Sequence, residues 1–360
     1  MLVSPSSLGV LRRVDGFCPD SYRGSFKRQE HGTRKSREPV GLETCATPVL
    51  SASARRTRQT LSLGLLLIAS SPSFADPVDG NAQIHATTKD STAVITTTRR
   101  LAGAIDSFQW NGHEFINSTD HGRQLQSACS FDNSPAANAE TFNPTEAGSR
   151  LDGVGTNSTS QLLELAATGK HLHTHTQMAF WLAPGERSEG QLARNTNKLS
   201  DYLLTKEVNI GFRHWPQALD YRVTFSVLAG THHVSAQFEA LTGYMPEEFS
   251  RFLEFNPASG KLQPLSDGPG EINHPVVLAT PDGKFAMGIF APPQSSPEMS
   301  GPSFGRWKFD WAHVVKWNCV YRVQNPQGIH DGDYSYRMLV PFGTVAQVEV
   351  MLRDWQALRW

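Results

Sequence analysis

The sequence predicts an all-β protein, a large antiparallel β-sandwich. Three observations support this fold class. Short runs rich in β-branched and aromatic residues alternate polar and apolar positions with a period of two. Turn signals separate these runs, and no internal repeat or long amphipathic helix interrupts them. Residues 76–360 continue without a linker, and a single domain of this length can bury a sizeable core unaided.

The first half of this domain is predicted as a series of hairpins. The strongest local signal is Asn111-Gly112, which favours a type I′ turn between strands at 103–110 and 113–117. Alternation of apolar and polar residues in the later runs is typical of an antiparallel sheet with one wet face. The other strands expected in this half are 83–88, 93–98, 162–167, 171–182, 201–212, 220–229 and 233–241.

The second half is less regular. Residues 247–255 fit either a short helix or a loop that leads into a strand, and residues 256–260 fit a turn. The Pro-Asp-Gly sequence at 281–283 predicts a turn between two strands. Residues 291–303, rich in Pro and Ser, are expected to form an exposed loop. The strands expected here are 275–280, 284–290, 312–323, 335–340 and 345–352.

The first 75 residues differ from the rest. Residues 53–75 combine a basic segment, an apolar stretch at 61–69 and the sequence Ser73-Phe74-Ala75, a pattern typical of a signal peptide. The apolar stretch is shorter than the about 20 residues that span a bilayer. We therefore expect cleavage near Ala75, a secreted or periplasmic protein, and no membrane association after cleavage. Residues 1–52 are expected to be disordered or untranslated.

Charge and cysteine content limit the classes of partner. The chain has 33 Lys+Arg and 34 Asp+Glu, but basic residues are concentrated before residue 76, so the remainder carries about −7. A nucleic-acid partner is not expected, because no cluster of basic side chains is present. Cys129 and Cys319 follow the leader, and either a disulfide or two buried thiols would fit. The sequence contains no signal for the oligomeric state.

A long polar segment, residues 120–153, is the most distinctive part of the chain. Few of its residues suit a core, and Gly and Pro residues break it, so we expect it in exposed loops. Long loops inside a compact domain are uncommon unless they are functional or disordered. We therefore favour recognition of a hydroxyl-rich ligand over a simple solvated connection. The side chains considered for this role include His121, Arg123, Gln124, Asn143 and Glu146.

Three histidines, His171, His173 and His175, are expected to project from one face of a strand, about 7 Å apart. The His-x-His spacing can supply metal ligands, but three histidines on one strand seldom reach a single ion. A wet strand face is therefore favoured over a metal site, and proton transfer or sugar contact by one histidine is more plausible than metal binding. No metal and no cofactor is predicted, and nucleotide-binding and G-x-S-x-G motifs are absent.

Carboxylates and tryptophans supply further candidates. A glycosidase needs two carboxyl groups, which the fold places rather than sequence distance. The carboxyl groups considered are Glu146, Glu239, Glu254, Asp310 and Asp331. An aromatic cluster follows, and Trp faces can stack on sugar rings. Its members are Trp307, Phe309, Trp311 and Trp317, beside Lys316. Half of these rings are expected in the core, with Trp307 and Trp317 as the exposed pair.

Three stretches carry a resemblance to a known family. They read GAIDSFQWNGHEFINSTDHGRQLQ at 103–126, FNPTEAGS at 142–149 and YSYRMLVPFGTVAQVEVML at 334–352. With the histidine-bearing strand, they resemble the galactose-mutarotase-like β-supersandwich and exported bacterial proteins with a DHGRQ…NPTEAG pattern. The resemblance implies a carbohydrate ligand on a concave sheet face. Mutarotases place a His acid and a Glu base there, and the corresponding candidates are His173 or His175 and Glu254 or Glu146.

The expected function is that of an exported carbohydrate-active enzyme, a polysaccharide lyase or a glycoside hydrolase. The alternatives are a non-catalytic carbohydrate-binding protein, a mutarotase- or epimerase-like enzyme, and a structural role in an envelope assembly. In the enzyme, Arg123 would bind an oxygen or a carboxylate, Asn143 and Glu146 would hold hydroxyls, and His175 would move the proton. This interpretation requires that the DHGRQ and NPTEAG turns lie side by side.

Overall fold

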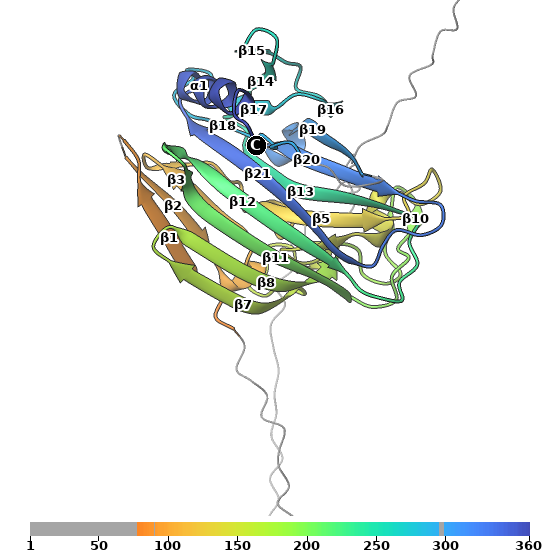
Figure 1. Ribbon diagram of the computed structural model, residues 1–360. Helices are drawn as coiled ribbons and strands as arrows, with labels where there is room; N and C mark the ends of the chain where they lie inside the picture. Colours follow the sequence, from red (N-terminus) through yellow and green to blue (C-terminus); the bar gives the residue numbers. More distant parts are fainter. Residues whose placement is uncertain (1–77, 90, 295–298) are drawn as a thin grey trace, which may run out of the picture. The chain divides into compact units, whose positions relative to one another are not determined.

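The computed structural model describes residues 78–89, 91–294 and 299–360. The predictions for residues 1–75, a disordered or untranslated leader and a signal peptide, lie outside these residues. Strands make up most of the regular structure, and one α-helix closes the described part of the chain (Figure 1). The prediction of an all-β sandwich is therefore confirmed.

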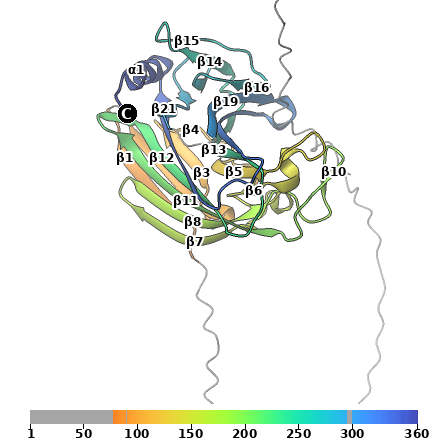
Figure 2. The ribbon, with the colours of Figure 1, turned by 45° about the vertical axis from the view of Figure 1, so that its right-hand side comes forward.

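Two groups of antiparallel strands form the layers of the sandwich, and we call them the front and back sheets. The front sheet consists, in spatial order, of β7 (Gln161–Thr168), β8 (His171–Phe180), β11 (Leu199–Phe212), β12 (Trp215–Val227) and β21 (Gly332–Gly343). The back sheet consists of β1 (Ala82–Thr87), β2 (Thr92–Thr97), β3 (Ile105–Trp110), β5 (Leu125–Phe131), β13 (Ser235–Pro246), β20 (Val314–Gln324), β19 (Met299–Phe309) and β16 (Gly270–Ile272). Figure 2 shows the same strands after a turn of 45°.

Shorter strands join and extend the two sheets. The strand β6 (Pro144–Thr145) pairs with both β5 and β8 and so links back to front. An extension from β21 runs through β18 (Ala286–Gly288), β17 (Val276–Ala279), β14 (Arg251–Asn256) and β15 (Lys261–Pro264). The remaining strands are β4 (His113–Glu114), β9 (Arg187–Ser188) and β10 (Gln191–Leu192).

The core lies between the front and back sheets, where alternate residues of both meet. The rings of Phe225 on β12 and Phe238 on β13 have their centroids 5.0 Å apart. Likewise, Tyr321 on β20 stacks on Tyr336 of β21 at 4.4 Å. Cross-sheet contacts of this kind bury the apolar face of each strand, which is the main favourable term in folding a sandwich.

The Asn111-Gly112 hairpin is confirmed. Both residues have positive φ, 53° and 71°, as a type I′ turn requires. Trp110 and His113 form the pair that closes the turn. The chain then leads directly into the segment that begins at Asp120.

The strand predicted at 345–352 is wrong, because these residues begin the helix α1 (Val345–Gln356). Thr344 and Gln347 form a capping box at its start, and Val348, Met351, Leu352 and Trp355 are buried with helical spacing. The closely spaced valines favoured a strand, but the apolar period is that of a helix. The loop expected at 291–303 is also shorter than predicted, since β19 begins at Met299.

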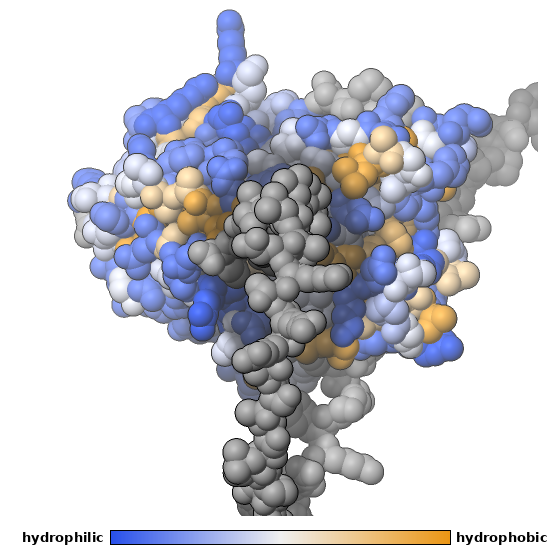
Figure 3. All heavy atoms as spheres, turned by 90° about the horizontal axis from the view of Figure 1, so that it is seen from below, coloured by the Kyte–Doolittle hydropathy of each residue, from blue (hydrophilic) through white to orange (hydrophobic). Residues whose placement is uncertain are grey.

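Three further observations complete the fold. Cys129 and Cys319 are buried free thiols, so the alternative without a disulfide holds. Among the described residues, no helix has the length and apolar character needed to cross a bilayer. The described surface in the view from below is mostly hydrophilic, with small scattered apolar patches (Figure 3).

Candidate functional site

The DHGRQ and NPTEAG turns lie side by side, as expected. Thr145 pairs with Ala128 across β5 and β6, and the backbone N–H of Glu146 donates to the Ser127 carbonyl at 3.1 Å. The backbone N–H of Ala147 donates to the Gln126 side chain at 3.1 Å. A Cβ added to Gly148 would lie 3.1 Å from the His121 ring. The two turns therefore form one connected unit.

This unit is buried, so the prediction that its side chains are exposed is wrong for four residues, His121, Gln124, Asn143 and Glu146. Both ring nitrogens of His121 lie 2.8 Å from backbone carbonyl oxygens, those of Gly153 and Arg100. The Gln124 amide donates to the Ser118 hydroxyl, and the Asn143 amide donates to the Cys129 carbonyl. These polar groups hold the chain in place, as buried polar groups must.

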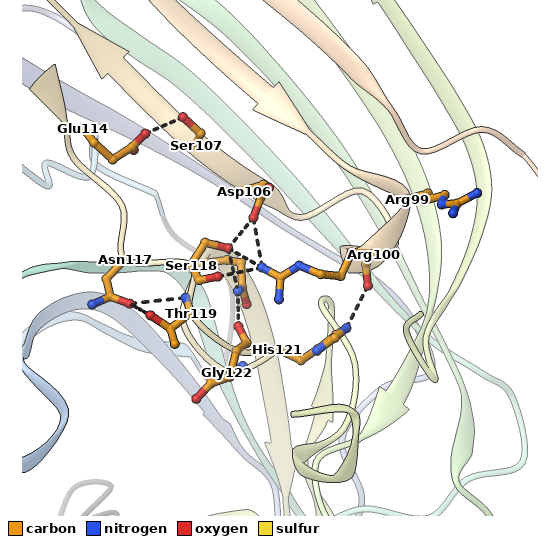
Figure 4. Close-up of polar contacts among 12 residues, drawn as sticks. Arg99, Arg100, Asp106, Ser107, Glu114, Asn117, Ser118, Thr119, His121 and Gly122 are labelled. Atoms are coloured by element: carbon orange, nitrogen blue, oxygen red, sulfur yellow. Dashed lines mark hydrogen bonds and ion pairs between the residues drawn. The ribbon is translucent and has the colours of Figure 1, made fainter. Parts of the chain in front are cut away.

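An ion pair between Arg100 and Asp106 holds the segment that precedes His121. Arg100 lies 3.1 Å from Asp106 and donates to the Ser118 carbonyl at 2.6 Å (Figure 4). The Ser118 hydroxyl donates to the same Asp106 carboxylate. Figure 4 shows how these three side chains converge just before the turn that carries His121. The Asp120 turn is therefore anchored rigidly against β3.

Glu146 lies in the interior between the sheets. Its carboxylate accepts a hydrogen bond from Lys206 Nζ and another, at 3.0 Å, from the backbone N–H of Ser127. Lys206 also donates to the Gly103 carbonyl, and both charged side chains are fully buried. Removing one partner of such a pair leaves an uncompensated buried charge. Glu146 thus ties the NPTEAG turn to β11.

The three histidines of β8 share the outer face of the front sheet. Within the described residues, no set of three or more His, Cys, Asp or Glu side chains is grouped to hold a metal ion. The nearest partner is Glu207, 2.6 Å from His173 Nδ1 and 3.0 Å from His171 Nε2. His175 Nδ1 lies 2.9 Å from the Thr205 hydroxyl. Glu254 lies elsewhere, on β14, where it accepts from Gln263.

Two predicted ligand contacts, Trp307 and Lys316, meet on the outer face of the back sheet. They are direct neighbours across β19 and β20, and Lys316 Nζ lies 4.8 Å from the Trp307 ring centroid. On the other side, Nζ lies 5.1 Å from the ring of Tyr244. Nζ is also 3.2 Å from the carboxylate of Glu239, which accepts from the Thr242 hydroxyl at 2.7 Å. We call these five residues the outer-face cluster.

The charge states within the outer-face cluster are set by its own contacts. Burial raises the pKa of the Glu239 carboxyl, but the charge of Lys316 and hydrogen bonds from Thr242, Lys316 and Asn318 outweigh it, so the pKa is lowered overall. For Lys316, burial lowers the pKa, and Glu239 more than restores it. Burial raises the pKa of Tyr244. The cluster therefore holds a carboxylate, an ammonium group and a neutral phenol.

The two oxygens of the Glu239 carboxylate differ in their contacts. Oε2 binds Thr242 and Lys316, whereas Oε1 is buried and has no hydrogen-bond partner of good geometry among the described residues. The Asn318 amide lies close enough to help lower the carboxyl pKa.

Arg123 and Trp311 border the outer-face cluster. The backbone N–H of Tyr244 donates to the Gln124 carbonyl, which brings the Asp120 turn beside the cluster. Arg123 pairs with Asp120 at 3.1 Å, and its guanidinium lies 6.0 Å from the Trp311 ring centroid. Trp311 is 54% exposed.

The exposure predicted for Trp307 and Trp317 is wrong. Trp307 is 2% exposed and lies against Lys316, while Trp317 is 0% exposed and packs in the core. Successive side chains of β20 point to opposite faces of the sheet. Lys316 therefore faces outward, where it meets Trp307, and Trp317 faces the core. Trp311 is the exposed ring of the group because it lies in the turn between β19 and β20.

Sequence reasoning missed Thr242 and Tyr244 as site residues. The predicted strand ended at residue 241, but β13 continues to Pro246. A register shift between Glu239 and Leu241 interrupts the period of two, so the polar face resumes at Thr242. The spacing of Thr242 and Tyr244, two residues apart beyond the interruption, was the signal in the sequence that could have predicted the longer strand.

Comparison with known proteins gives loose similarities of fold. No family model matches the chain, and no curated protein matches it. The Slr1438 protein of Synechocystis sp. PCC 6803 is 10% identical, with 73% of this chain and 96% of that chain covered and a TM-score of 0.40. A candidate aldose 1-epimerase of Klebsiella pneumoniae is 13% identical, with 77% and 92% covered and a TM-score of 0.39. The GH36 α-galactosidase AgaB of Geobacillus stearothermophilus is 10% identical, with 73% and 40% covered and a TM-score of 0.37. No activity follows from similarities of this size.

Proposed function

We propose that this protein is an exported carbohydrate-active enzyme whose ligand binds at the outer-face cluster of the back sheet. The observation that carries the proposal is the Glu239–Lys316 ion pair, whose ammonium group lies between the rings of Trp307 and Tyr244. Sugar sites combine aromatic rings, which contact C–H faces, with a few charged groups that orient hydroxyls. Trp311 supplies an exposed ring in the turn between β19 and β20, next to Arg123.

The outer-face cluster can perform acid–base chemistry. Glu239 is ionised, so it can accept a proton from a sugar hydroxyl. Tyr244 and Lys316 carry protons that can be returned to a ring or glycosidic oxygen. Removal of a proton from the anomeric hydroxyl by Glu239, with protonation of the ring oxygen by Tyr244, opens the ring and allows the anomers to exchange. This reaction requires no second carboxylate, and it is the one that the cluster supports best.

Glycoside hydrolysis is the second candidate. It is favoured by Glu140, which lies in the short helical turn Ala139–Phe142, because the charge of Lys316 acts on its carboxyl group and Glu140 is therefore within electrostatic reach of the cluster. Hydrolysis uses one carboxyl group as an acid and another as a base or nucleophile. Burial raises the pKa of Glu140 despite a hydrogen bond from Ser188, whereas the pKa of Glu239 is lowered. Two carboxyl groups whose pKa values are moved apart in this way suit the roles of acid and base.

A single set of assays separates these reactions from binding alone. The purified protein is incubated with free aldoses and with oligosaccharides, and anomer exchange is followed by NMR while new reducing ends are quantified. We expect exchange or cleavage for at least one sugar, and a loss of about 100-fold or more in turnover in Glu239→Gln with affinity retained. Binding without turnover in the unmodified protein would support a non-catalytic role. Full turnover in Glu239→Gln would overturn the proposal.

A further inference from the structure

We infer that the ligand of the outer-face cluster is an uncharged sugar, and not a uronate or a sugar phosphate. This inference rests on the function proposed above and specifies its substrate class. The argument concerns the cations that the back sheet directs toward the ligand. On β5, β13 and β20, which form the middle of that sheet, the cationic side chains are Lys316 and Arg322. Arg123 approaches from the Asp120 turn.

Each of these cations already has a carboxylate partner. Lys316 pairs with Glu239 at 3.2 Å, as described above. Arg322 binds Glu271 through two nitrogens, at 2.7 and 2.9 Å, and its Nε donates to Gln237 at 3.0 Å. Arg123 pairs with Asp120 at 3.1 Å. The charges on this face are therefore balanced pair by pair.

An anionic sugar would have to compete with these internal carboxylates. Binding its charge at Lys316 would place a second anion next to Glu239, in a buried setting where a like charge is costly. Displacing Glu239 instead would leave that carboxylate buried and unpaired. An uncharged hydroxyl meets neither penalty, because it brings no second negative charge next to Glu239 and leaves the Glu239–Lys316 pair intact. Through this carboxylate, the site selects against a second negative charge.

Matched pairs of methyl glycosides test this selection. Each pair consists of a neutral hexoside and the uronoside with the same configuration, for the gluco, galacto and manno series, and affinities are measured by calorimetry or ligand-observed NMR. For at least one pair we expect the neutral member to bind and the uronoside to bind at least about 100-fold more weakly, as the cost of disrupting a buried ion pair implies. Equal or tighter binding of a uronoside overturns this inference and leaves the proposed function standing. Absence of binding by every neutral glycoside also overturns this inference, whereas the proposed function is tested separately by the turnover assays with free aldoses and oligosaccharides.

Two variants make the test independent of the choice of sugar. Glu239→Gln removes the competing negative charge next to Lys316, and we expect the ratio of uronoside to hexoside affinity to rise at least about tenfold. Glu271→Gln removes the carboxylate that pairs with Arg322 and leaves the cluster unchanged, and we expect the same affinity ratio to rise. Circular dichroism and Tm of this variant report whether it is folded. The matched control is Glu349→Gln, which removes a carboxylate from its pair with Lys261 at the distant helix α1 and should leave the ratio unchanged. An unchanged ratio in both folded site variants would refute the inference.

Discussion

The ammonium nitrogen of Lys316 lies 3.2 Å from the carboxylate of Glu239, and both side chains are almost fully buried on the outer face of the back sheet. The two residues are not opposite each other in the ladder, since Lys316 pairs with Tyr244 and Glu239 with Val320. The pair therefore forms diagonally, across the irregular part of β13. It places a fixed carboxylate and a fixed proton donor at one point of an aromatic surface.

The buried pair of Lys206 and Glu146 is predicted to stabilise the sandwich without contacting the ligand. Lys206→Met leaves the Glu146 carboxylate buried without its cation, and we expect the free energy of unfolding to fall by about 3–5 kcal/mol. Urea denaturation measures this loss. The double variant Lys206→Met, Glu146→Gln should recover part of it, because no unpaired charge remains. Equal stability of the unmodified protein and Lys206→Met would contradict the interior role of Glu146.

Acid stability is predicted to depend on Asp132. The side chain of His233, 2.7 Å away, and the backbone N–H groups of Val234 and Ser235 lower the pKa of this carboxyl below 3.8, against the effect of partial burial. A lowered pKa means that the stabilisation is present above pH 3.8 and is lost as the pH falls through the lower folded-state value.

The measurement for Asp132 is Tm as a function of pH from 7 to 2.5. Asp132→Asn should lower Tm near neutral pH and flatten its decline below about pH 4, because the titrating group is gone. Other carboxylates with lowered pKa, such as Glu239, would still titrate in the variant. Parallel curves for the two proteins would show that Asp132 does not contribute to the acid transition.

Replacement of His175 tests the assignment of proton transfer that the sequence suggested. This residue lies on the outer face of the front sheet and contacts Thr205, whereas the outer-face cluster belongs to the back sheet. We expect His175→Ala, and likewise His173→Ala, to keep turnover within about twofold, and Tyr244→Phe to lose about 100-fold. A large loss in His175→Ala with normal folding would move the catalytic site to the histidine face.

Export is predicted to remove the leader. Expression of the full chain in a Gram-negative host, followed by N-terminal sequencing of the protein in the periplasm or the medium, should give a chain that begins at Asp76. Ser73→Leu together with Ala75→Leu should block processing, because signal peptidase requires small residues at both positions. Retention of the intact leader in the cytoplasm by the unmodified protein would contradict this expectation.

Local patterns determined which parts of the fold could be predicted. The hairpin at Asn111-Gly112 was predictable because that dipeptide adopts positive φ readily. Strands with strict alternation, such as β8, were also predictable, because their period of two is visible within the strand itself. The helix α1 was missed because its closely spaced valines match a strand as well as a helix over one turn, and only the full span to Trp355 shows the helical period.

The site was harder to predict than the fold because burial of polar residues depends on partners that are distant in sequence. His121 and Asn143 are polar and lie beside glycines or prolines, which favours a surface loop, yet their partners are the carbonyl groups of Arg100, Gly153 and Cys129. Glu146 likewise meets Lys206 from another sheet. The sequence predicted Lys316 and Trp307 as ligand contacts, but only the pairing of β13, β19 and β20 brings Glu239 to them.

A structure of the protein with a bound sugar is the most direct test of the central claim that the ligand lies on the outer face of the back sheet. It can be obtained with Glu239→Gln and a saturating methyl hexoside, so that turnover does not remove the ligand. The account predicts a sugar hydroxyl within hydrogen-bond distance of residue 239 and a pyranose face against Trp311 or Tyr244. Density for the sugar over His173 and His175 on the front sheet, with the outer-face cluster empty, would contradict it.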